Sequence, residues 1–235
     1  MTLRPQDLAR RSFLWRKLVD AGARFAEVNG TAAAMDFGAP KLELDVARRM
    51  GLADLSPLPR TGYKGRGALD WLRGRGVTVP DANNMAAPQP DGSLACRLAP
   101  SEALLLDALD GAPGLSAELD AAWPGPDAGT GAYKVPRPET NLWVMLTGAA
   151  AAGMFAKICG VDLRPAKFAD HAIAQTQVAR LSGIVVRADL GDTLAYHFLT
   201  DSASAAYVWD VLTDAIAEFD GGPVGLAALQ QLARA

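Results

Sequence analysis

The amino-acid sequence predicts an α+β fold made of two related lobes with antiparallel sheets. Two stretches of the chain resemble each other, residues 67–80 and residues 148–165. Each begins with Gly-Ala, carries an aromatic residue in its middle, and reaches a Gly-Val pair and then a proline. Each also leaves a strand-like segment, forms a helix, turns at Gly-Val and returns through further strands. A duplicated β-α-β-β unit of this kind gives a half-open antiparallel sheet covered by helices.

Five segments are expected along the chain, and the composition between the lobes sets their boundary. Residues 111–131 are rich in Gly, Pro, Ala and Asp, which is typical of a connection. The expected order is an N-terminal extension of helices and a strand (1–53), a first lobe (54–110), a linker with a short helix (111–134), a second lobe (135–220) and a peripheral tail (221–235).

The individual elements follow from local periodicity and from turn residues. Apolar residues recur at helical spacing over residues 6–21, and Gly22 can end that helix in a left-handed conformation. Residues 103–106 are apolar but too few to distinguish a strand from a helix. The other expected strands are 24–28, 93–98, 141–147, 172–181, 183–188 and 194–199. The other expected helices are 44–50, 67–73, 116–122, 148–159 and a last one capped by Thr200 or Asp201, and 77–90 is expected as a turn-rich loop.

Composition argues against several classes of function. The 235 residues carry a formal net charge of −3, so no basic surface for nucleic acid is implied. No apolar run approaches the ~20 residues that a membrane crossing needs, and the first residues lack the apolar segment of a signal peptide. Cys96 and Cys159 stand in apolar settings and suggest neither a disulfide framework nor a zinc site. We therefore expect a cytoplasmic protein.

A glycine-rich segment with basic residues is the first candidate for binding. Gly62, Gly65 and Gly67 surround Lys64 and Arg66, follow an extended segment and open a helix, so backbone amides could face an anion. The spacing, however, matches neither the dinucleotide-binding pattern nor the phosphate loop of nucleotide hydrolases. A strand-to-helix turn with solvated charges is the favoured interpretation.

Residues that could carry catalysis are few. The sequence holds two histidines: His197 lies in a strand pattern, and His171 follows Asp170 in a turn. No G-x-S-x-G elbow supports a serine hydrolase, and no clustered ligands support a metal site. The plentiful aspartates mostly stand at helix starts or turns, where capping explains them. Trp143 and Trp209 lie on apolar faces and are expected in the core.

Several blocks of the sequence resemble the gamma subunit of heterotetrameric sarcosine oxidases. They occur in the order of that family: LSPLPRTGYKG (55–65), LAPSEALLL (98–106), VPR (135–137), CGVDLRP (159–165), AQTQVARL (174–181) and DSAS (201–204). The resemblance extends from about residue 54 to residue 219. Residues 18–56 are also similar to the opening of aminomethyltransferases of the glycine cleavage T-protein type, a superfamily that binds tetrahydrofolate.

This resemblance implies a T-protein-like folate-binding fold without the C-terminal domain, and it makes residues 104–106 a strand. It also implies partners: an alpha subunit with FAD, NAD and a folate domain, a beta subunit with FMN, and a small delta subunit with zinc. Such complexes oxidise N-methyl amino acids and pass the one-carbon unit to tetrahydrofolate. No cofactor is expected on this chain alone. Arg60, Lys64, Arg66 and Arg137 are the residues available for a folate glutamate tail or for an interface.

One departure from the superfamily bears on activity. T-proteins carry a catalytic aspartate shortly after a Gly-Gly-Ile-type strand start, and the comparable stretch here is DGSLACR (91–97). Ala95 and Cys96 stand where carboxylates are expected, so no charge is evident to stabilise a folate-bound iminium. A non-catalytic subunit is therefore expected. The alternatives are an autonomous folate-binding protein or small aminomethyltransferase, and a subunit of an N-methylglutamate dehydrogenase or related methylamine-demethylating complex.

Overall fold

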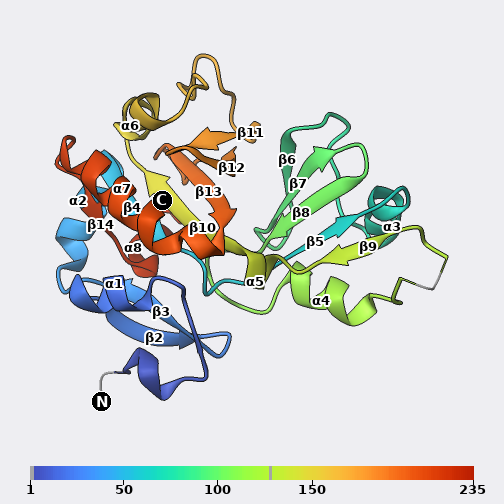
Figure 1. Cartoon of the computed structure of the whole chain (residues 1–235), viewed down its shortest axis with the longest axis horizontal. Helices are drawn as coiled ribbons and strands as arrows, with labels where there is room; N and C mark the ends of the chain where they lie inside the picture. Colours follow the sequence, from blue (N-terminus) through green and yellow to red (C-terminus); the bar gives the residue numbers. More distant parts are fainter. Residues whose placement is uncertain (1–2, 127–128) are drawn as a thin grey trace.

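The computed structural model describes residues 3–126 and 129–235 (Figure 1). Its strands are β1 (Arg10–Arg11), β2 (Arg24–Val28), β3 (Thr31–Asp36), β4 (Gly51–Asp54), β5 (Arg60–Lys64), β6 (Met85–Pro88), β7 (Leu94–Ala99), β8 (Glu102–Leu106), β9 (Tyr133–Val135), β10 (Asn141–Thr147), β11 (Ile173–Val178), β12 (Leu181–Arg187), β13 (Ala195–Asp201) and β14 (Gly222–Pro223). Its α-helices are α1 (Trp15–Asp20), α2 (Pro40–Met50), α3 (Ala68–Gly74), α4 (Leu115–Ala122), α5 (Arg137–Thr140), α6 (Ala151–Ile158), α7 (Ala205–Ala217) and α8 (Leu226–Leu232), with 3-10 turns η1 (Pro5–Asp7) and η2 (Ser202–Ser204).

The strands form two large sheets and one small one. The six-stranded sheet has the order β11-β12-β13-β10-β4-β14, the five-stranded sheet has the order β6-β7-β8-β5-β9, and β1-β3-β2 form the third. All pairings in the five-stranded sheet are antiparallel, and in the six-stranded sheet only β14 runs parallel to its neighbour β4. Figure 1 shows the two large sheets in separate halves of the molecule, with α5 between them. The α+β fold with open antiparallel sheets is confirmed.

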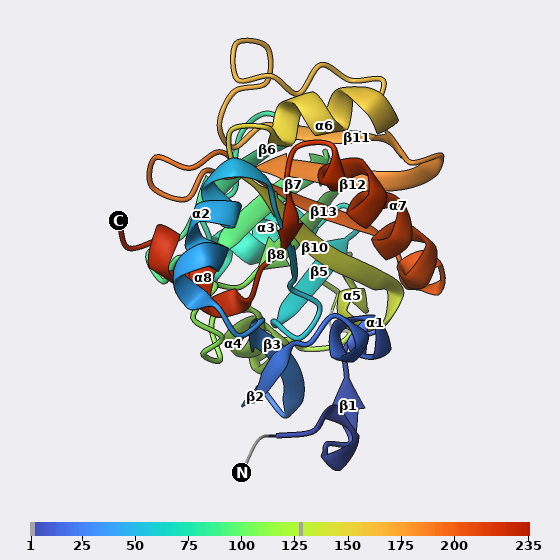
Figure 2. The ribbon, with the colours of Figure 1, turned by 90° about the vertical axis from the view of Figure 1, so that its left-hand side faces the viewer.

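Strand β10 shows how the layers are built. Leu142, Val144 and Leu146 pack in a hydrophobic cluster with α6 and α7, whereas Trp143 and Met145 point the other way, into a cluster shared with β7 and β8. This alternation follows from the two-residue period of a strand. Figure 2 views the molecule from the side of α2, α7 and α8 and shows these helices in front of the six-stranded sheet. We call the apolar layer between the two large sheets the seam.

The helix expected over residues 6–21 is wrong in its first half. Only Trp15–Asp20 is α-helical, and Arg10–Arg11 instead form strand β1, which pairs in parallel with β3. The hydroxyl of Ser12 accepts a hydrogen bond from the Leu14 amide and donates to the buried carboxylate of Asp54. Because this tertiary contact fixes the chain just before α1, residues 6–14 do not follow their helical periodicity.

The C-terminal residues pack more closely than a peripheral tail would. Residues 222–223 form β14, and α8 buries Leu226, Leu229 and Leu232 in the cluster that fills the seam. The apolar residues of α8 recur at helical spacing, which is the signal that could have predicted a buried helix. The expected loop at 77–90 likewise contains a strand, β6 (Met85–Pro88), which pairs with β7. No helix in the described parts of the chain has the length and apolar character needed to cross a membrane.

Candidate functional site

A polar hollow of about 500 Å³ opens where β10, β11, β12 and β13 approach the five-stranded sheet. Its polar lining is mostly amides and hydroxyls rather than charges: Asn141, Gln175, Thr176, Gln177, Ser182 and Thr200, with Asp201 at the margin. The Asp201 carboxylate already accepts a hydrogen bond from the Ala203 amide and so caps η2. The hollow is therefore suited to a neutral, hydrogen-bonding group.

Two features hold this hollow in shape. The side-chain amide of Gln175 donates to the Leu98 carbonyl and to the Asn84 side chain, both at 2.7 Å, and so ties β11 to the five-stranded sheet. On β12, a Cβ at Gly183 would overlap the ring of Phe198. Only glycine lets the strand pass over that ring, which explains the glycine at this position of β12.

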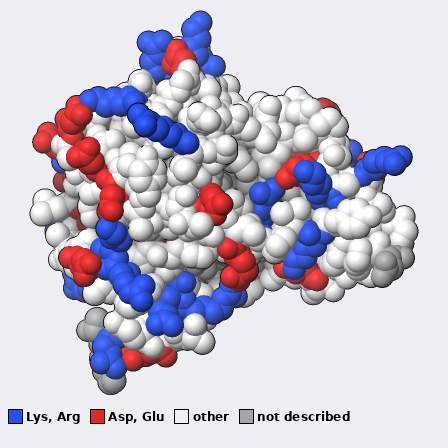
Figure 3. Space-filling model, in the orientation of Figure 1, with Lys and Arg blue, Asp and Glu red and all other residues white. Residues whose placement is uncertain are grey.

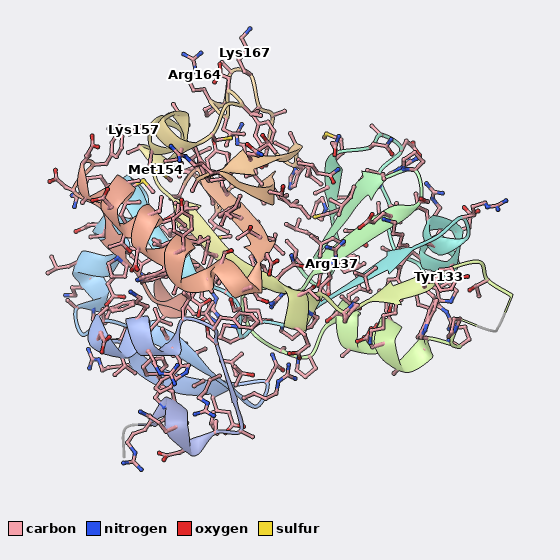
Figure 4. All side chains as sticks on the ribbon, viewed as in Figure 1. Tyr133, Arg137, Met154, Lys157, Arg164 and Lys167 are labelled. Carbon is pink, nitrogen blue, oxygen red and sulfur yellow. The ribbon has the colours of Figure 1, made fainter. Side chains whose placement is uncertain are left out.

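Arg137 lies beside this hollow, at the start of α5, between the two halves of the molecule (Figure 4). Its guanidinium donates to Glu102 at 2.6 Å and lies 3.5 Å from the side-chain oxygen of Asn141. Glu102 also pairs with Lys64 at 3.1 Å. The buried Arg137 Nε has no partner in the described structure, and a Cβ at Gly62 would lie 2.9 Å from it. The structure thus brings Lys64 and Arg137 together around one carboxylate.

Arg60 donates to backbone carbonyls and not to Glu102. It is 2% exposed, and its two terminal nitrogens donate to the carbonyls of Ser56, Leu58, Pro138 and Asn141. Burial lowers the pKa of its guanidinium to about 10. With four carbonyls bound, Arg60 fastens residues 56–60 to α5 and β10.

Arg66 lies in the glycine-rich segment, where the protein's own carbonyls occupy two of the backbone amides that an anion would need. The Gly67 amide donates to the Gly131 carbonyl and the Gly65 amide donates to the Ser101 carbonyl. A Cβ on Gly67 would overlap the Thr130 carbonyl oxygen. These close approaches explain the glycines, while Lys64 and Arg66 remain exposed at the rim. The turn interpretation of this segment therefore fits its geometry.

The stretch expected to carry a catalytic carboxylate forms β7, and its central residues are part of the core. Ala95 is 1% exposed and packs toward α3, whereas Cys96 is fully buried in the seam. Burial raises the pKa of the Cys96 thiol to about 12, so no thiolate forms at neutral pH. Asp91, at the start of this stretch, accepts hydrogen bonds from Ser93 and from the Leu115 amide, which is a structural role.

The two histidines do not come together. His197 is buried, and its Nδ1 accepts a hydrogen bond from the indole N–H of Trp143 at 3.1 Å. Burial lowers the pKa of His197 to about 3, so the ring is neutral at physiological pH. His171 lies in a turn with a positive φ, next to Asp170. Within the described residues, no group of three or more His, Cys, Asp or Glu side chains could hold a metal ion.

Sequence reasoning missed the residues that line the polar hollow. Gln175 lies in the block AQTQVARL and Asn141 begins the expected strand 141–147, but neither was among the predicted site residues. The available signal was the pair of glutamines at alternate positions of a strand, since alternate residues share one face of a sheet. The contacts of Gln175 with Asn84 and Leu98 depend on the packing of β11 against the other sheet and cannot be derived from spacing.

Comparison with known proteins places the fold. No family model matches the sequence, and no curated protein matches it. Among solved structures, glycine cleavage system aminomethyltransferase T from Bartonella henselae is similar with a TM-score of 0.73 and 18% identity, over 95% of this chain and 62% of that one. Heterotetrameric sarcosine oxidase from Corynebacterium sp. U-96, in complex with pyrrole 2-carboxylate, is similar with a TM-score of 0.60 and 21% identity, over 80% of this chain and 96% of the matched chain.

These two neighbours are the ones that the sequence resemblance anticipated. The chain has the fold that they share, as predicted, and it spans only 62% of the length of the aminomethyltransferase. It matches almost the whole of one chain of the sarcosine oxidase, at 96% coverage. The fold alone is established by similarities at this level of identity.

Proposed function

We propose that this chain is a non-catalytic, gamma-type subunit of a heterotetrameric, tetrahydrofolate-dependent sarcosine oxidase, which oxidatively demethylates an N-methyl amino acid. The observation that carries the proposal is strand β7. Where T-proteins place a catalytic carboxylate, this chain has Ala95 and Cys96, both buried and both in hydrophobic clusters. A side chain in that position cannot reach a ligand, and the Cys96 thiol stays protonated.

The match to a chain of a heterotetrameric sarcosine oxidase supports the assignment to a complex. On this proposal the chemistry belongs to the partners: an alpha subunit with FAD, NAD and a folate domain, a beta subunit with FMN and a delta subunit with zinc. On the same proposal, this chain itself holds none of these groups. A cytoplasmic location accords with its two free cysteines, Cys96 and Cys159.

One observation favours a second candidate, a folate-binding protein that acts on its own. The polar hollow offers neutral amides for a pterin-like ring, and Arg137 beside it has a buried Nε without a partner among the described residues. Glu102 already pairs with both Arg137 and Lys64, however, so neither cation is without a partner that a glutamate tail would have to displace. The subunit role is therefore preferred.

The decisive experiment combines two measurements on the full chain. Tetrahydrofolate is titrated into the purified chain by calorimetry, and the chain is co-expressed with candidate flavin- and zinc-bearing subunits encoded near it. We expect no heat of binding when tetrahydrofolate is titrated into the chain alone. We also expect that affinity purification of the co-expressed chain yields a complex with flavin absorbance. The flavin spectrum reports the partners directly, because this chain is proposed to hold no flavin.

Arg137→Gln provides the matched control for the folate alternative. If the unaltered chain bound tetrahydrofolate and Arg137→Gln weakened that binding, the autonomous protein would be favoured and the subunit proposal would fail. If the complex oxidised N-methylglutamate rather than sarcosine, the proposed subunit role would stand and the proposed substrate would change. Failure of every flavin-bearing partner to co-purify would count against both complexes.

A further inference from the structure

A second hollow, of about 660 Å³, lies where the N-terminal segment meets residues 56–60, α4 and α5. Its walls are formed by residues 9–13, 15–16, 56–60, 116–117 and 120, together with Asn29, Thr31, Pro138 and Glu139. Figure 3 shows Lys and Arg side chains gathered over this part of the surface, near α1 and the N-terminal segment. We call it the arginine hollow.

The positive charges of the arginine hollow exceed the negative ones. Arg10, Arg11 and Arg16 line it and are exposed, and Arg60 contributes a buried fourth guanidinium. Of the lining carboxylates, Glu139 pairs with Arg10 at 2.8 Å. Within the described chain neither Arg11 nor Arg16 forms an ion pair, and Arg60 binds carbonyl oxygens alone.

The other lining carboxylate, Asp120, is also occupied. It pairs with Lys134 at 2.6 Å and accepts hydrogen bonds from the hydroxyls of Thr61 and Tyr63. The lining carboxylates therefore leave at least two arginines without a counter-charge inside the described protein. Cations so placed attract an anionic partner, because their mutual repulsion is relieved when carboxylates approach.

Apolar groups lie among these charges. The guanidinium groups of Arg11 and Arg16 lie 5.5 Å and 4.5 Å from the ring centre of Trp15, on which they stack. Phe13, between them in sequence, is 40% exposed. An aromatic ring flanked by guanidinium groups is typical of protein interfaces, where Trp, Phe and Arg are enriched. A ligand with both carboxylates and apolar side chains would satisfy both kinds of group.

The backbone of the same segment adds a third feature. Strand β1 (Arg10–Arg11) is at the edge of the small sheet and, among residues 3–126 and 129–235, pairs on one side only, with β3. An edge strand can pair with an extended segment of another chain, and main-chain hydrogen bonds then add to side-chain contacts. A small inorganic anion would use the arginines but neither the edge nor the aromatic rings.

We propose that the arginine hollow binds an extended, acidic segment of a partner polypeptide, one whose glutamate or aspartate residues alternate with apolar residues. Its carboxylates pair with Arg11 and Arg16, its apolar residues lie against Phe13 and Trp15, and its backbone runs beside β1. The identity of the natural partner rests on the subunit role proposed above, but the test of peptide binding does not use that partner.

The test measures binding of a short dye-labelled peptide of alternating glutamate and leucine to the full chain by fluorescence anisotropy. We expect saturable binding that weakens as salt is raised, and no binding of the same peptide with glutamine in place of glutamate. The double variant Arg11→Gln/Arg16→Gln should bind about tenfold more weakly, since two partly exposed ion pairs together contribute roughly that factor.

The matched control is Arg73→Gln/Arg75→Gln, which removes the same charge from exposed arginines near another tryptophan, Trp71. Equal loss in both double variants would show a nonspecific charge effect and overturn the proposal. Binding of inorganic phosphate with the same dependence on Arg11 and Arg16, without binding of the peptide, would also overturn it. Peptide binding together with failure to capture a flavin-bearing complex would support the arginine hollow as a binding site and reject the subunit role.

Discussion

The arginines of this chain fall into two groups that differ in what surrounds them. Arg60 and Arg137 are buried, and their terminal nitrogens donate to backbone carbonyls or to Glu102. Arg11 and Arg16 are exposed on the arginine hollow and contact a tryptophan ring. The buried pair joins segments that are distant in sequence, whereas the exposed pair adds little to the fold. Conspicuous basic residues in a sequence thus need not be the ones that meet a ligand.

The largest expected effect comes from the buried group. Arg60→Met leaves four carbonyl oxygens without their donor, and we expect a loss of roughly 3–5 kcal/mol in the free energy of unfolding. Arg60→Lys should lose less, because an ammonium donates up to three hydrogen bonds but lacks the planar fork. Denaturant unfolding followed by circular dichroism measures both. A loss below about 1 kcal/mol for Arg60→Met would mean that water replaces the guanidinium.

The glycine-rich segment at residues 62–67 sharpens the comparison between buried and exposed arginines, because its sequence fits either an anion site or a turn. Gly67→Ala places a methyl group against the Thr130 carbonyl, and we expect a loss of about 3 kcal/mol, at the upper end of overpacking costs. Gly74→Ala, in the helix α3 that Gly67 precedes, has no described atom within 4 Å of the new methyl group and should instead gain up to about 0.5–1 kcal/mol. Equal effects would show that residues 129–131 do not press on the segment.

Much of the fold could be predicted from sequence, because strand and helix periods are local. The expected strand at 141–147 coincides with β10 (Asn141–Thr147), and the expected helix at 116–122 lies within α4 (Leu115–Ala122). The first half of the 6–21 helix could not be predicted, since the Ser12–Asp54 contact and the pairing with β3 decide it.

The candidate site was less predictable than the fold. Arg60, Lys64, Arg66 and Arg137 were singled out for charge and motif, yet only Lys64 and Arg137 meet, and they do so through Glu102. The arginine hollow brings residues 9–16 to residues 116–120 and 138–139, and nothing in the spacing of these segments indicates that they are neighbours. Such juxtapositions arise from packing between layers.

The burial of His197 can be tested through the pH dependence of the free energy of unfolding. The folded-state pKa of His197 is lowered to about 3, below its unfolded value of about 6.5, so the unfolded chain takes up the proton first as the solution is acidified. Stability from this group is complete above pH 6.5 and falls as the pH drops toward 3. Between pH 7 and pH 5 we expect a loss of about 2 kcal/mol.

His197→Gln should flatten that slope, because glutamine still accepts the Trp143 hydrogen bond but does not titrate. His171→Gln, which changes the other histidine of the chain, should keep the slope and serves as the control. Urea unfolding at several pH values between 5 and 7 gives the comparison. A slope unchanged in His197→Gln would show that the proton uptake occurs elsewhere.

The smallest expected effect belongs to the exposed arginines and completes the contrast with Arg60. Arg11→Gln/Arg16→Gln should change the free energy of unfolding by less than about 0.5 kcal/mol, as surface substitutions usually do. The stacking of both guanidinium groups on Trp15 in a solvated position contributes only weakly. Loss of acidic-peptide binding in a variant of unchanged stability would assign these side chains to recognition. A loss of stability similar to that of Arg60→Met would instead place them among the residues that hold the N-terminal segment to the fold, and the division into two groups of arginines would no longer hold.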